Sequence, residues 1–366
     1  MSFESGGVSF RIYYLTEPLP GNVIERFAAQ AAPPIATLGQ GEIHGWVSGR
    51  HLLDRQINEN TALYAGFLRV TLMSAQRKIP EALLRAECRM EELARMQAGG
   101  QAVLDRKTRT EIRREISERL LPQMPPELKG MTLVHRRGER FMYAEAVSDK
   151  QVDAFSIGLR QTVGQGPIPA DPVTVAARRR QLDVRTLSPA SFSPECPDEE
   201  SGDSIGQEFL TWLWYFSEAR GGLAKFADLG QFGVVVEGPL TFVLEGSGAH
   251  EAVVRRGCPE LSSEAKAALL SGKKLRRARL TMARGDEQWQ ATVDADSFAF
   301  RAVRLPEKEK IDALSRFQER VLALDTFQGA FFGFYDRFLD DRTSADKWPK
   351  VQRDIQHWVA ERVARR

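Results

Sequence analysis

Cysteine is scarce in this sequence, and long apolar runs are absent from it. The three cysteines, Cys88, Cys196 and Cys258, are far apart and odd in number. They predict neither a disulfide framework nor a metal-binding knuckle, and they fit a reducing compartment. No segment approaches the roughly 18 consecutive apolar residues of a membrane helix, and the N-terminus lacks the basic and apolar regions of a signal peptide. We therefore expect a cytoplasmic protein without a membrane partner.

The sequence also lacks a charge excess of either sign. Its 51 Lys and Arg residues are balanced by 49 Asp and Glu residues, a net charge of +2, which excludes a histone-like tail and an acidic disordered chain. Lysine is rare, at 12 residues, so the other 39 cations are arginine, the side chain that forks phosphate oxygens in pairs. The 366 residues, 42% of them hydrophobic, are enough for about two or three globular domains.

Motifs of the common catalytic sites are missing from the sequence. There is no Walker A loop, HExxH motif, nucleophile elbow or kinase motif set. The glycine-rich segment 39–45 has the wrong spacing for a dinucleotide-binding turn, and His44 and His51 lack the carboxylate or thiolate neighbours of a metal site. We therefore expect no cofactor, no bound metal and no catalytic residue.

Two pairs of carboxylates keep a nuclease open as the alternative. Glu208 and Glu218 lie on one predicted helix, about 80° apart around its axis. Asp294 and Asp296 alternate with apolar residues at a strand end. Two-metal nucleases use such pairs, but a third carboxylate and a suitably placed lysine are not evident. We favour the simpler interpretation, with the glutamates on the solvated side of an aromatic helix and the aspartates in a turn.

Hydrophobic periodicity predicts an α+β fold, with mixed or antiparallel sheets and packed helices. The predicted strands are 8–15, 67–73, 131–134, 140–146, 232–236, 240–244, 274–282 and 289–293. The predicted helices of the second half are 208–218, 262–270, 311–341 and 350–366. The segment 39–49 is expected to be a loop, and 237–239 the turn of a hairpin. A short similarity between 138–155 and 285–300 indicates two related halves.

Residues 79–121 predict a helical hairpin that projects from the body. The first helix carries apolar residues at helical spacing, namely Leu83, Ala86, Met90 and Leu93. Thr108 and Glu111 predict a capping box for the second helix. The second helix has one narrow apolar stripe, formed by Ile112, Ile116 and Leu120. Such a stripe suits packing against a single neighbouring helix rather than burial on all sides.

Composition predicts the domain boundaries. We expect an N-terminal α+β domain at 1–78 and 130–163, a hairpin tip at 79–129, a linker-like segment at 164–206, a C-terminal α+β domain at 207–345 and a C-terminal helix at 346–366. The linker-like segment is rich in Gly, Pro, Ser and Asp, the residues typical of turns and loops.

Clusters of cations carry the strongest functional signal. Alternation on the strand 274–282 places Arg277 and Arg279 in a charged row about 7 Å apart, which is close to the phosphate spacing along one nucleic-acid strand. A second cluster surrounds the hairpin turn, and a third comprises Arg136, Arg137 and Arg140. The candidate DNA-binding residues are Arg106, Lys107, Arg109, Arg113, Lys273, Lys274, Arg276, Arg277 and Arg279.

Segregated charge on a nearly neutral chain indicates a polyanionic partner. The sequence has no helix-turn-helix spacing, zinc finger or RNP motif. We therefore expect DNA contacts mainly to the phosphate backbone, with little sequence preference.

The order of these elements is similar to that of the RdgC family of bacterial recombination-associated proteins. The resemblance covers about residues 8–175. It is carried by the first strand and helix, Gly45-Trp46-Val47, Lys78-Ile79-Pro80, the helix 81–97, the basic turn 105–109 and the segment 115–122. The later segments 208–214, 298–304 and 317–338 look like the longer form of that family.

The resemblance implies an α+β protein that dimerises into a ring with a basic hole and holds DNA without sequence preference. It also implies restraint of RecA-driven recombination, association with the nucleoid, and a hairpin that closes one side of the ring. By position, Arg106, Lys107, Arg109 and Arg113 fall in the basic tip of the family. The segment 176–206 and the extra C-terminal helix depart from its shorter members.

Three functional hypotheses follow. The first is a non-enzymatic, sequence-independent DNA-binding homodimer that modulates RecA-dependent recombination. The second is a metal-dependent DNA exonuclease that uses Glu208, Glu218, Asp294 or Asp296. The third is a protein-interaction factor that acts directly on a recombinase through the aromatic C-terminal helix. We favour the first hypothesis.

Overall fold

The protein is described by a computed structural model over residues 3–100, 102–198, 204–244, 251–258, 262–306 and 312–364. It has 43% helix and 27% strand, which confirms the predicted α+β class. Its contacts divide the chain into two compact units. Unit 1 comprises Met1–Pro18, Gly138–Asp153 and Gly166–Arg366, and unit 2 comprises Leu19–Arg137 and Ala154–Gln165. Each unit is therefore assembled from segments that are distant in the sequence.

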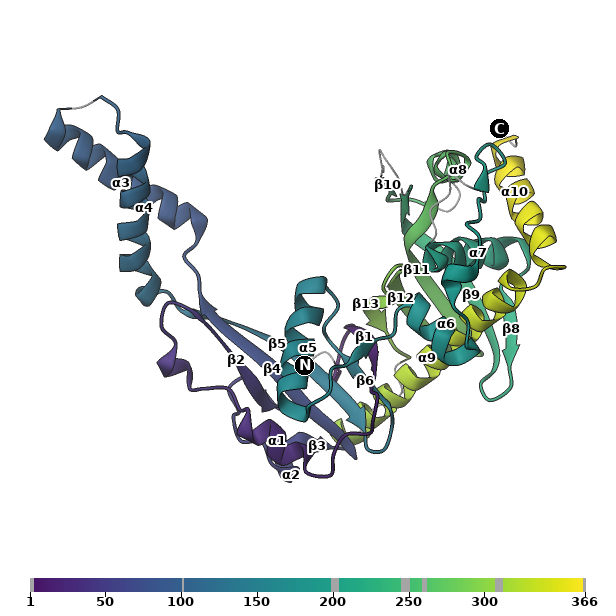
Figure 1. Ribbon diagram of the computed structural model, residues 1–366, viewed down its shortest axis with the longest axis horizontal. Coiled ribbons are helices and arrows are strands. Elements are labelled where there is room, and N and C mark those ends of the chain that lie inside the picture. Colours follow the sequence, from purple (N-terminus) through teal and green to yellow (C-terminus); the bar gives the residue numbers. More distant parts are fainter. Residues whose placement is uncertain are drawn as a thin grey trace. The chain divides into compact units, whose positions relative to one another are not determined.

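An antiparallel sheet forms the centre of unit 1, with the strand order β10-β9-β11-β12-β13-β1-β6 (Figure 1). Its strands are β1 (Val8–Tyr14), β6 (Phe141–Ala144), β9 (Gly230–Val243), β10 (Glu251–Val254), β11 (Lys274–Arg284), β12 (Glu287–Asp294) and β13 (Ala299–Arg304). Two short strands extend it, since β7 (Ile168–Pro169) pairs with β1 and β8 (Leu223–Phe226) pairs with β9. The first strand of the chain therefore lies between strands that come much later in the sequence.

Aromatic helices cover one face of the unit 1 sheet. The helices of this unit are α6 (Pro172–Arg180), α7 (Ile205–Ala219), α8 (Ser263–Leu270), α9 (Ala313–Arg342) and α10 (Trp348–Ala364). Helix α7 packs against β9 and β11, and it meets α9 through ring contacts such as Phe209 with Phe331, at 5.5 Å between centroids. Trp212 stacks on Phe216 at 5.1 Å. Phe209, Trp212, Phe216 and Phe331 are almost completely buried.

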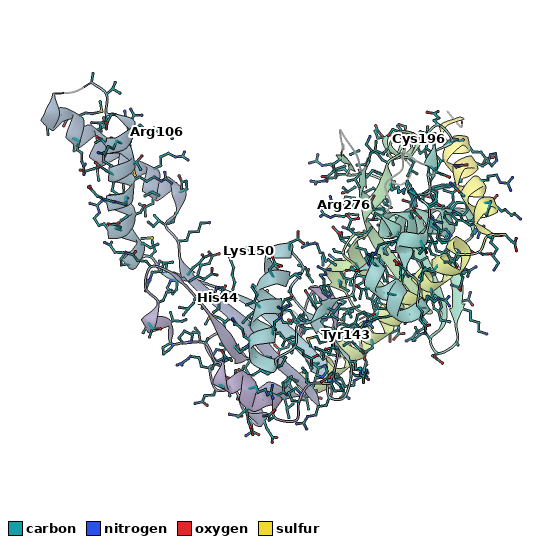
Figure 2. The ribbon with its side chains drawn as sticks, in the orientation of Figure 1. His44, Arg106, Tyr143, Lys150, Cys196 and Arg276 are labelled. Atoms are coloured by element: carbon teal, nitrogen blue, oxygen red, sulfur yellow. The ribbon has the colours of Figure 1, made fainter. Side chains whose placement is uncertain are left out.

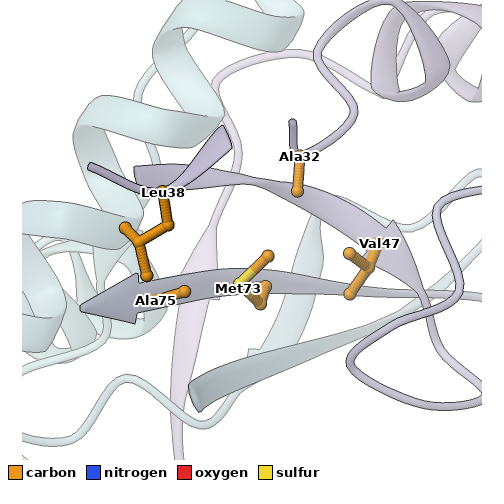
Figure 3. Close-up of a cluster of buried hydrophobic side chains, with 5 residues drawn as sticks. All are labelled: Ala32, Leu38, Val47, Met73 and Ala75. Carbon is orange, nitrogen blue, oxygen red and sulfur yellow. The ribbon is translucent and has the colours of Figure 1, made fainter. Parts of the chain in front are cut away.

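Unit 2 is built on a smaller antiparallel sheet with the order β5-β4-β2. Its strands are β2 (Glu42–Ser48), β4 (Phe67–Arg77), β5 (Pro126–Arg136) and the short β3 (Leu63–Tyr64), and its helices include α1 (Val23–Ala29), α2 (Glu59–Ala62) and most of α5 (Asp149–Val163). The buried Trp46 contacts Phe27 at 4.6 Å and donates its indole N–H to Thr162 at 2.8 Å. A second core cluster comprises Ala32, Leu38, Val47, Met73 and Ala75 (Figure 3).

The predicted helical hairpin consists of α3 (Glu81–Gly99) and α4 (Arg106–Leu120), which belong to unit 2 (Figure 1). It has its own apolar core, formed by Leu84, Leu104, Ile112, Ile116 and Leu120. The predicted capping box is wrong, because Asp105 caps α4 by accepting the Thr108 N–H at 2.9 Å. The apolar stripe predicted on the first helix faces solvent, with Leu83, Met90 and Leu93 exposed.

Three local predictions are corrected by the sheet pairing. The segment 39–49 is not a loop, because β2 pairs with β4 along its whole length. Gly45 fits there because a Cβ at this position would lie 2.3 Å from the Ala32 Cα. The expected hairpin turn at 237–239 is absent, because β9 runs continuously through it and pairs with β11. The two similar segments diverge, since one continues into helix α5 and the other into strand β13.

The segment 164–206, predicted to be linker-like, contains helix α6 and a 3₁₀ turn at Val184–Thr186 in its described part. Arg179 of α6 forms an ion pair with Asp336 of α9. The domain boundaries drawn from composition stay predictions.

Candidate nucleic-acid interface

Strand β11 presents one apolar face and one polar face, as the sequence predicts. Ala278, Leu280 and Met282 are almost completely buried on the helix-covered side. Arg279 is exposed on the other side, and Arg277 is partly exposed. The alternation that places a cationic row on β11 is therefore present, and the contact of this row with DNA stays a prediction.

The neighbouring strands extend this polar face, because residues opposite one another in antiparallel strands point to the same side. Arg279 lies opposite Thr292 of β12, and Thr292 lies opposite Arg301 of β13. In the adjacent row, Thr281 is paired with Gln290, and Gln290 with Arg304. We call the five side chains Arg279, Arg301, Arg304, Gln290 and Thr292 the open face. Arginine forks, hydroxyls and amides are the groups that bind phosphate and sugar oxygens.

Arg301 and Arg304 of the open face were missed from the sequence. They are three residues apart, so strict alternation would place them on opposite faces. The register shifts between Gln290 and Thr292, and Ala302 has a φ of 50°. This irregularity inserts one residue and brings both arginines to the polar side. Only the basic composition of Arg301-Ala-Val-Arg304 could have drawn attention to them.

Lys274 does not belong to the open face. It is 3% exposed, and its Nζ lies 3.3 Å from the Glu208 carboxylate. The other oxygen of Glu208 accepts a hydrogen bond from Arg342 Nε at 2.8 Å. Lys274 is therefore part of a buried ionic cluster and is not available to a phosphate in this structure. Lys273 is partly exposed, and its ammonium contacts the Ser271 hydroxyl at 3.2 Å.

Arg276 and Arg277 are each held by an aspartate. Arg277 Nε donates to Asp294 at 2.6 Å, and this hydrogen bond raises the pKa of the guanidinium. Arg276 Nε lies 2.8 Å from Asp296, which also accepts hydrogen bonds from Ser204 and Gln207 of the α7 N-terminal turn. Both arginines remain partly exposed, at 36% and 41% of the side chain. Arg276 is labelled in Figure 2.

The second predicted cluster lies in unit 2, at the beginning of α4. Arg106, Lys107 and Arg109 are exposed, and no ion pair involves them within the described parts of the chain. Arg106 is labelled in Figure 2. A hydrogen bond from Thr108 lowers the pKa of the capping carboxylate, Asp105. Cations in the first turn of a helix oppose the macrodipole, at a cost of about 0.3–1 kcal/mol each. Their position is unfavourable for the helix and favourable for binding an anion.

Arg113, the fourth predicted hairpin residue, is engaged within the hairpin. Its guanidinium lies 3.2 Å from Glu81 of α3. Arg119 and Arg95 make similar pairs across the two helices, with Glu87 and Glu115 respectively. These exposed pairs each contribute little stability, but all three join α3 to α4.

The carboxylates considered for a nuclease are separated and already have partners. Glu208 is buried against two cations, whereas Glu218 is exposed and accepts the Trp214 indole N–H at 2.6 Å. The expectation that Glu208 faces solvent is therefore wrong. Asp294 and Asp296 hold arginines, as described above. Over the described ranges, no group of three or more His, Cys, Asp or Glu side chains is arranged to hold a metal ion.

The fold and this interface define an α+β protein with cations on a sheet face and at a helix start. Residues 9–182 match the RdgC family, whose description reads "Putative exonuclease, RdgC". This match supports an RdgC-family protein, as the resemblance predicts. The match includes the helical hairpin and ends before β11. No curated protein matches the chain, and no helix in the described segments is long and apolar enough to cross a membrane.

Proposed function

We propose that this protein binds DNA without sequence preference, through the phosphate backbone, as a homodimeric clamp or ring. In this role it would act at the nucleoid, in the cytoplasm, and limit the access of RecA to DNA. It would need no cofactor and no catalytic residue. The observation that carries the proposal is the open face, where three arginines from two strands stand among hydroxyl and amide side chains.

The open face supports backbone binding rather than base reading. The open face belongs to a multi-stranded sheet, which is wider than the single helix or two-stranded ribbon that the major groove admits. Its cations would neutralise phosphates and release counterions, which makes the affinity strongly dependent on salt. The first turn of α4 supports the same function, because the three cations there form no ion pair with the described residues.

The test is duplex binding as a function of salt, with EDTA present and a labelled duplex of scrambled sequence. The wild-type protein should bind tightly at low salt, and log K should fall steeply with log salt, by about 0.9 per phosphate contact. Replacing Arg279, Arg301 and Arg304 with Gln should weaken binding to every sequence equally and reduce the slope by about two to three. Replacing Arg106, Lys107 and Arg109 with Gln should do the same if the hairpin also contacts DNA.

A matched control removes the same kind of charge from paired positions. Arg113 and Arg119 lie on the same hairpin as Arg106, but both are engaged with glutamates of α3. Their double replacement with Gln should change DNA affinity much less than the triple replacement at the turn. Weak or salt-insensitive binding by the wild-type protein would refute the proposal and favour a factor that contacts a recombinase directly.

The dimer has a specific candidate contact in the hairpin. Leu83, Met90 and Leu93 are 36%, 62% and 43% exposed on one side of α3. An apolar stripe on an exposed two-helix unit is a typical helix-packing surface, and the family resemblance suggests a second copy as its partner. Replacing Met90 and Leu93 with Glu should shift the protein from dimer to monomer in sedimentation velocity. An unchanged dimer would place the contact elsewhere.

The family description favours one alternative, a DNA exonuclease. This alternative predicts that the protein digests a labelled duplex when Mg²⁺ or Mn²⁺ is added. The activity should co-purify with the protein and disappear in Asp294→Asn. We expect intact DNA instead, because each candidate carboxylate already binds a cation or an indole. Digestion that survives this substitution would point to other residues or to a contaminant.

A further inference from the structure

Two consecutive arginines occupy a bulge in β11. The register with β9 shifts between Leu275 and Arg277, so an extra residue is inserted into β11 at this point. Leu275 and Ala278 are both fully buried, and the two residues between them are both partly exposed. A bulge of this kind redirects side chains that regular alternation would send to opposite faces. Arg276 and Arg277 can therefore both reach solvent.

Each of these arginines lies against an aspartate. Arg277 Nε donates a hydrogen bond to Asp294 at 2.6 Å, whereas Arg276 Nε lies 2.8 Å from Asp296 in an ion pair and forms no hydrogen bond with the described residues. The terminal amino groups of both guanidinium groups make no hydrogen bond within the described residues. These terminal groups are donors with which arginine forks a phosphate or carboxylate.

The anchoring aspartates are themselves fixed. The Asp294 side chain is 8% exposed and accepts a hydrogen bond from Ser297 at 3.1 Å. Asp296 accepts hydrogen bonds from Ser204 at 3.1 Å and from Gln207 at 2.8 Å. These two partners belong to the cap and the first turn of α7. Each arginine therefore contacts an aspartate whose own position is fixed by hydrogen bonds.

We infer that Asp294 and Asp296 are positioning residues, which aim the free forks of Arg277 and Arg276 at phosphate groups of the nucleic-acid backbone. This inference rests on the proposed function and names two further contacts for it. Pre-oriented side chains lose less conformational freedom when they bind. The opposite interpretation is that the aspartates merely neutralise the arginines and weaken DNA binding.

Two substitutions of Asp294 separate these interpretations. Asp294→Asn keeps an oxygen for Arg277 Nε, and the Ser297 hydroxyl can turn to accept from the amide. Affinity for the scrambled duplex should then stay within about twofold or increase, because a negative charge is removed from beside the phosphates. Asp294→Ala also removes the anchor, and binding should weaken about threefold to tenfold despite the more positive surface.

Substitution of the arginine gives a second, independent test. Arg277→Lys keeps the charge, but the ammonium would sit on Asp294 and leave no fork. We expect about threefold to tenfold weaker binding. The matched control is Arg284→Lys on the same strand, because Arg284 lies outside the open face and its Nη2 already donates to Glu287 at 2.7 Å. This variant should keep the affinity within about twofold. The Nε–H resonance of Arg277 should be protected from exchange in wild type and Asp294→Asn, and lose that protection in Asp294→Ala.

The outcomes distinguish this inference from the proposed function. A wild-type protein that does not bind duplex at low salt overturns both. If the wild-type protein binds and Asp294→Ala binds as tightly or more tightly, the aspartate only neutralises charge and the inference alone fails. It also fails if Asp294→Asn loses as much affinity as Asp294→Ala. Urea unfolding of each variant, measured in parallel, identifies any loss that comes from misfolding.

Discussion

The buried cluster around Glu208 leads to the sharpest stability prediction. The Glu208 side chain is 2% exposed and lies between Lys274 and Arg342, which come from β11 and α9. Arg342 also donates to the carbonyl oxygen of Ser188. One carboxylate therefore joins a strand, two helices and the segment that follows α6. Glu208→Gln removes the negative charge that Lys274 and Arg342 share, and both of these cations are buried.

The expected loss of stability is large for a change of one atom. Removing one partner of a buried ion pair costs about 3–5 kcal/mol, because the remaining charge stays buried. Glutamine keeps the shape of the side chain and one acceptor for Arg342, so we expect the free energy of unfolding to fall by about 3 kcal/mol. For a unit of this size, that corresponds to a fall in Tm of about 6–12 °C. Lys274→Met should cost less, because Glu208 keeps Arg342.

Urea unfolding followed by tryptophan fluorescence measures this loss, since Trp212 and Trp214 lie on the same helix as Glu208. The control is Glu218→Gln, in which the amide oxygen can still accept the Trp214 indole N–H. This exposed position should lose less than about 0.5 kcal/mol. The reasoning is refuted if Glu208→Gln costs less than about 1 kcal/mol, or if the two variants lose stability equally.

Three smaller predictions concern other sites. Gly45→Ala should destabilise unit 2 by about 1–3 kcal/mol in urea unfolding, because its Cβ would overlap the Ala32 backbone; unchanged stability would contradict the close approach. The pKa of Asp105 is lowered, so its capping hydrogen bond stabilises the hairpin at neutral pH and is lost as the pH falls through this pKa. Asp105→Asn should therefore make the helix content, measured by circular dichroism, less sensitive to acid. Burial raises the pKa of the Cys88 thiol, so a disulfide reagent at pH 8 should label the exposed Cys258 faster; equal rates would argue against it.

Much of the fold could be predicted because its elements have strong local signals. The aromatic periodicity of α9 and the serine cap of α8 define those helices without any tertiary information. The errors occur where distant pairing decides the structure. Strand β2 has a glycine-rich sequence, but β4 provides a full set of partners for it. The turn-like Gly238-Pro239 lies within β9, because β11 pairs with β9 on both sides of it.

The candidate site was predicted less completely than the fold, and for a consistent reason. Counting cations finds the basic strand, but burial and bulges decide which cations are available. Lys274 is unavailable because it forms a buried ion pair with Glu208, a partner 66 residues away in the sequence. Arg301 and Arg304 share a face only because one residue is inserted between their pairing partners. Such irregularities cannot be predicted from hydrophobic periodicity, because they depend on the register of two strands.

The discontinuous composition of unit 1 has a consequence for synthesis on the ribosome. Strand β1 is made almost 300 residues before β13, yet it lies beside β13 in the finished sheet. All segments of unit 2 are available once Gln165 has emerged, so this unit can fold first. At typical rates of about 5–20 residues per second, β1 then waits roughly ten to thirty seconds for β13. During this interval the edge of β1 that will receive β13 is open to other strands, and a nascent chain stalled there would be prone to mispairing.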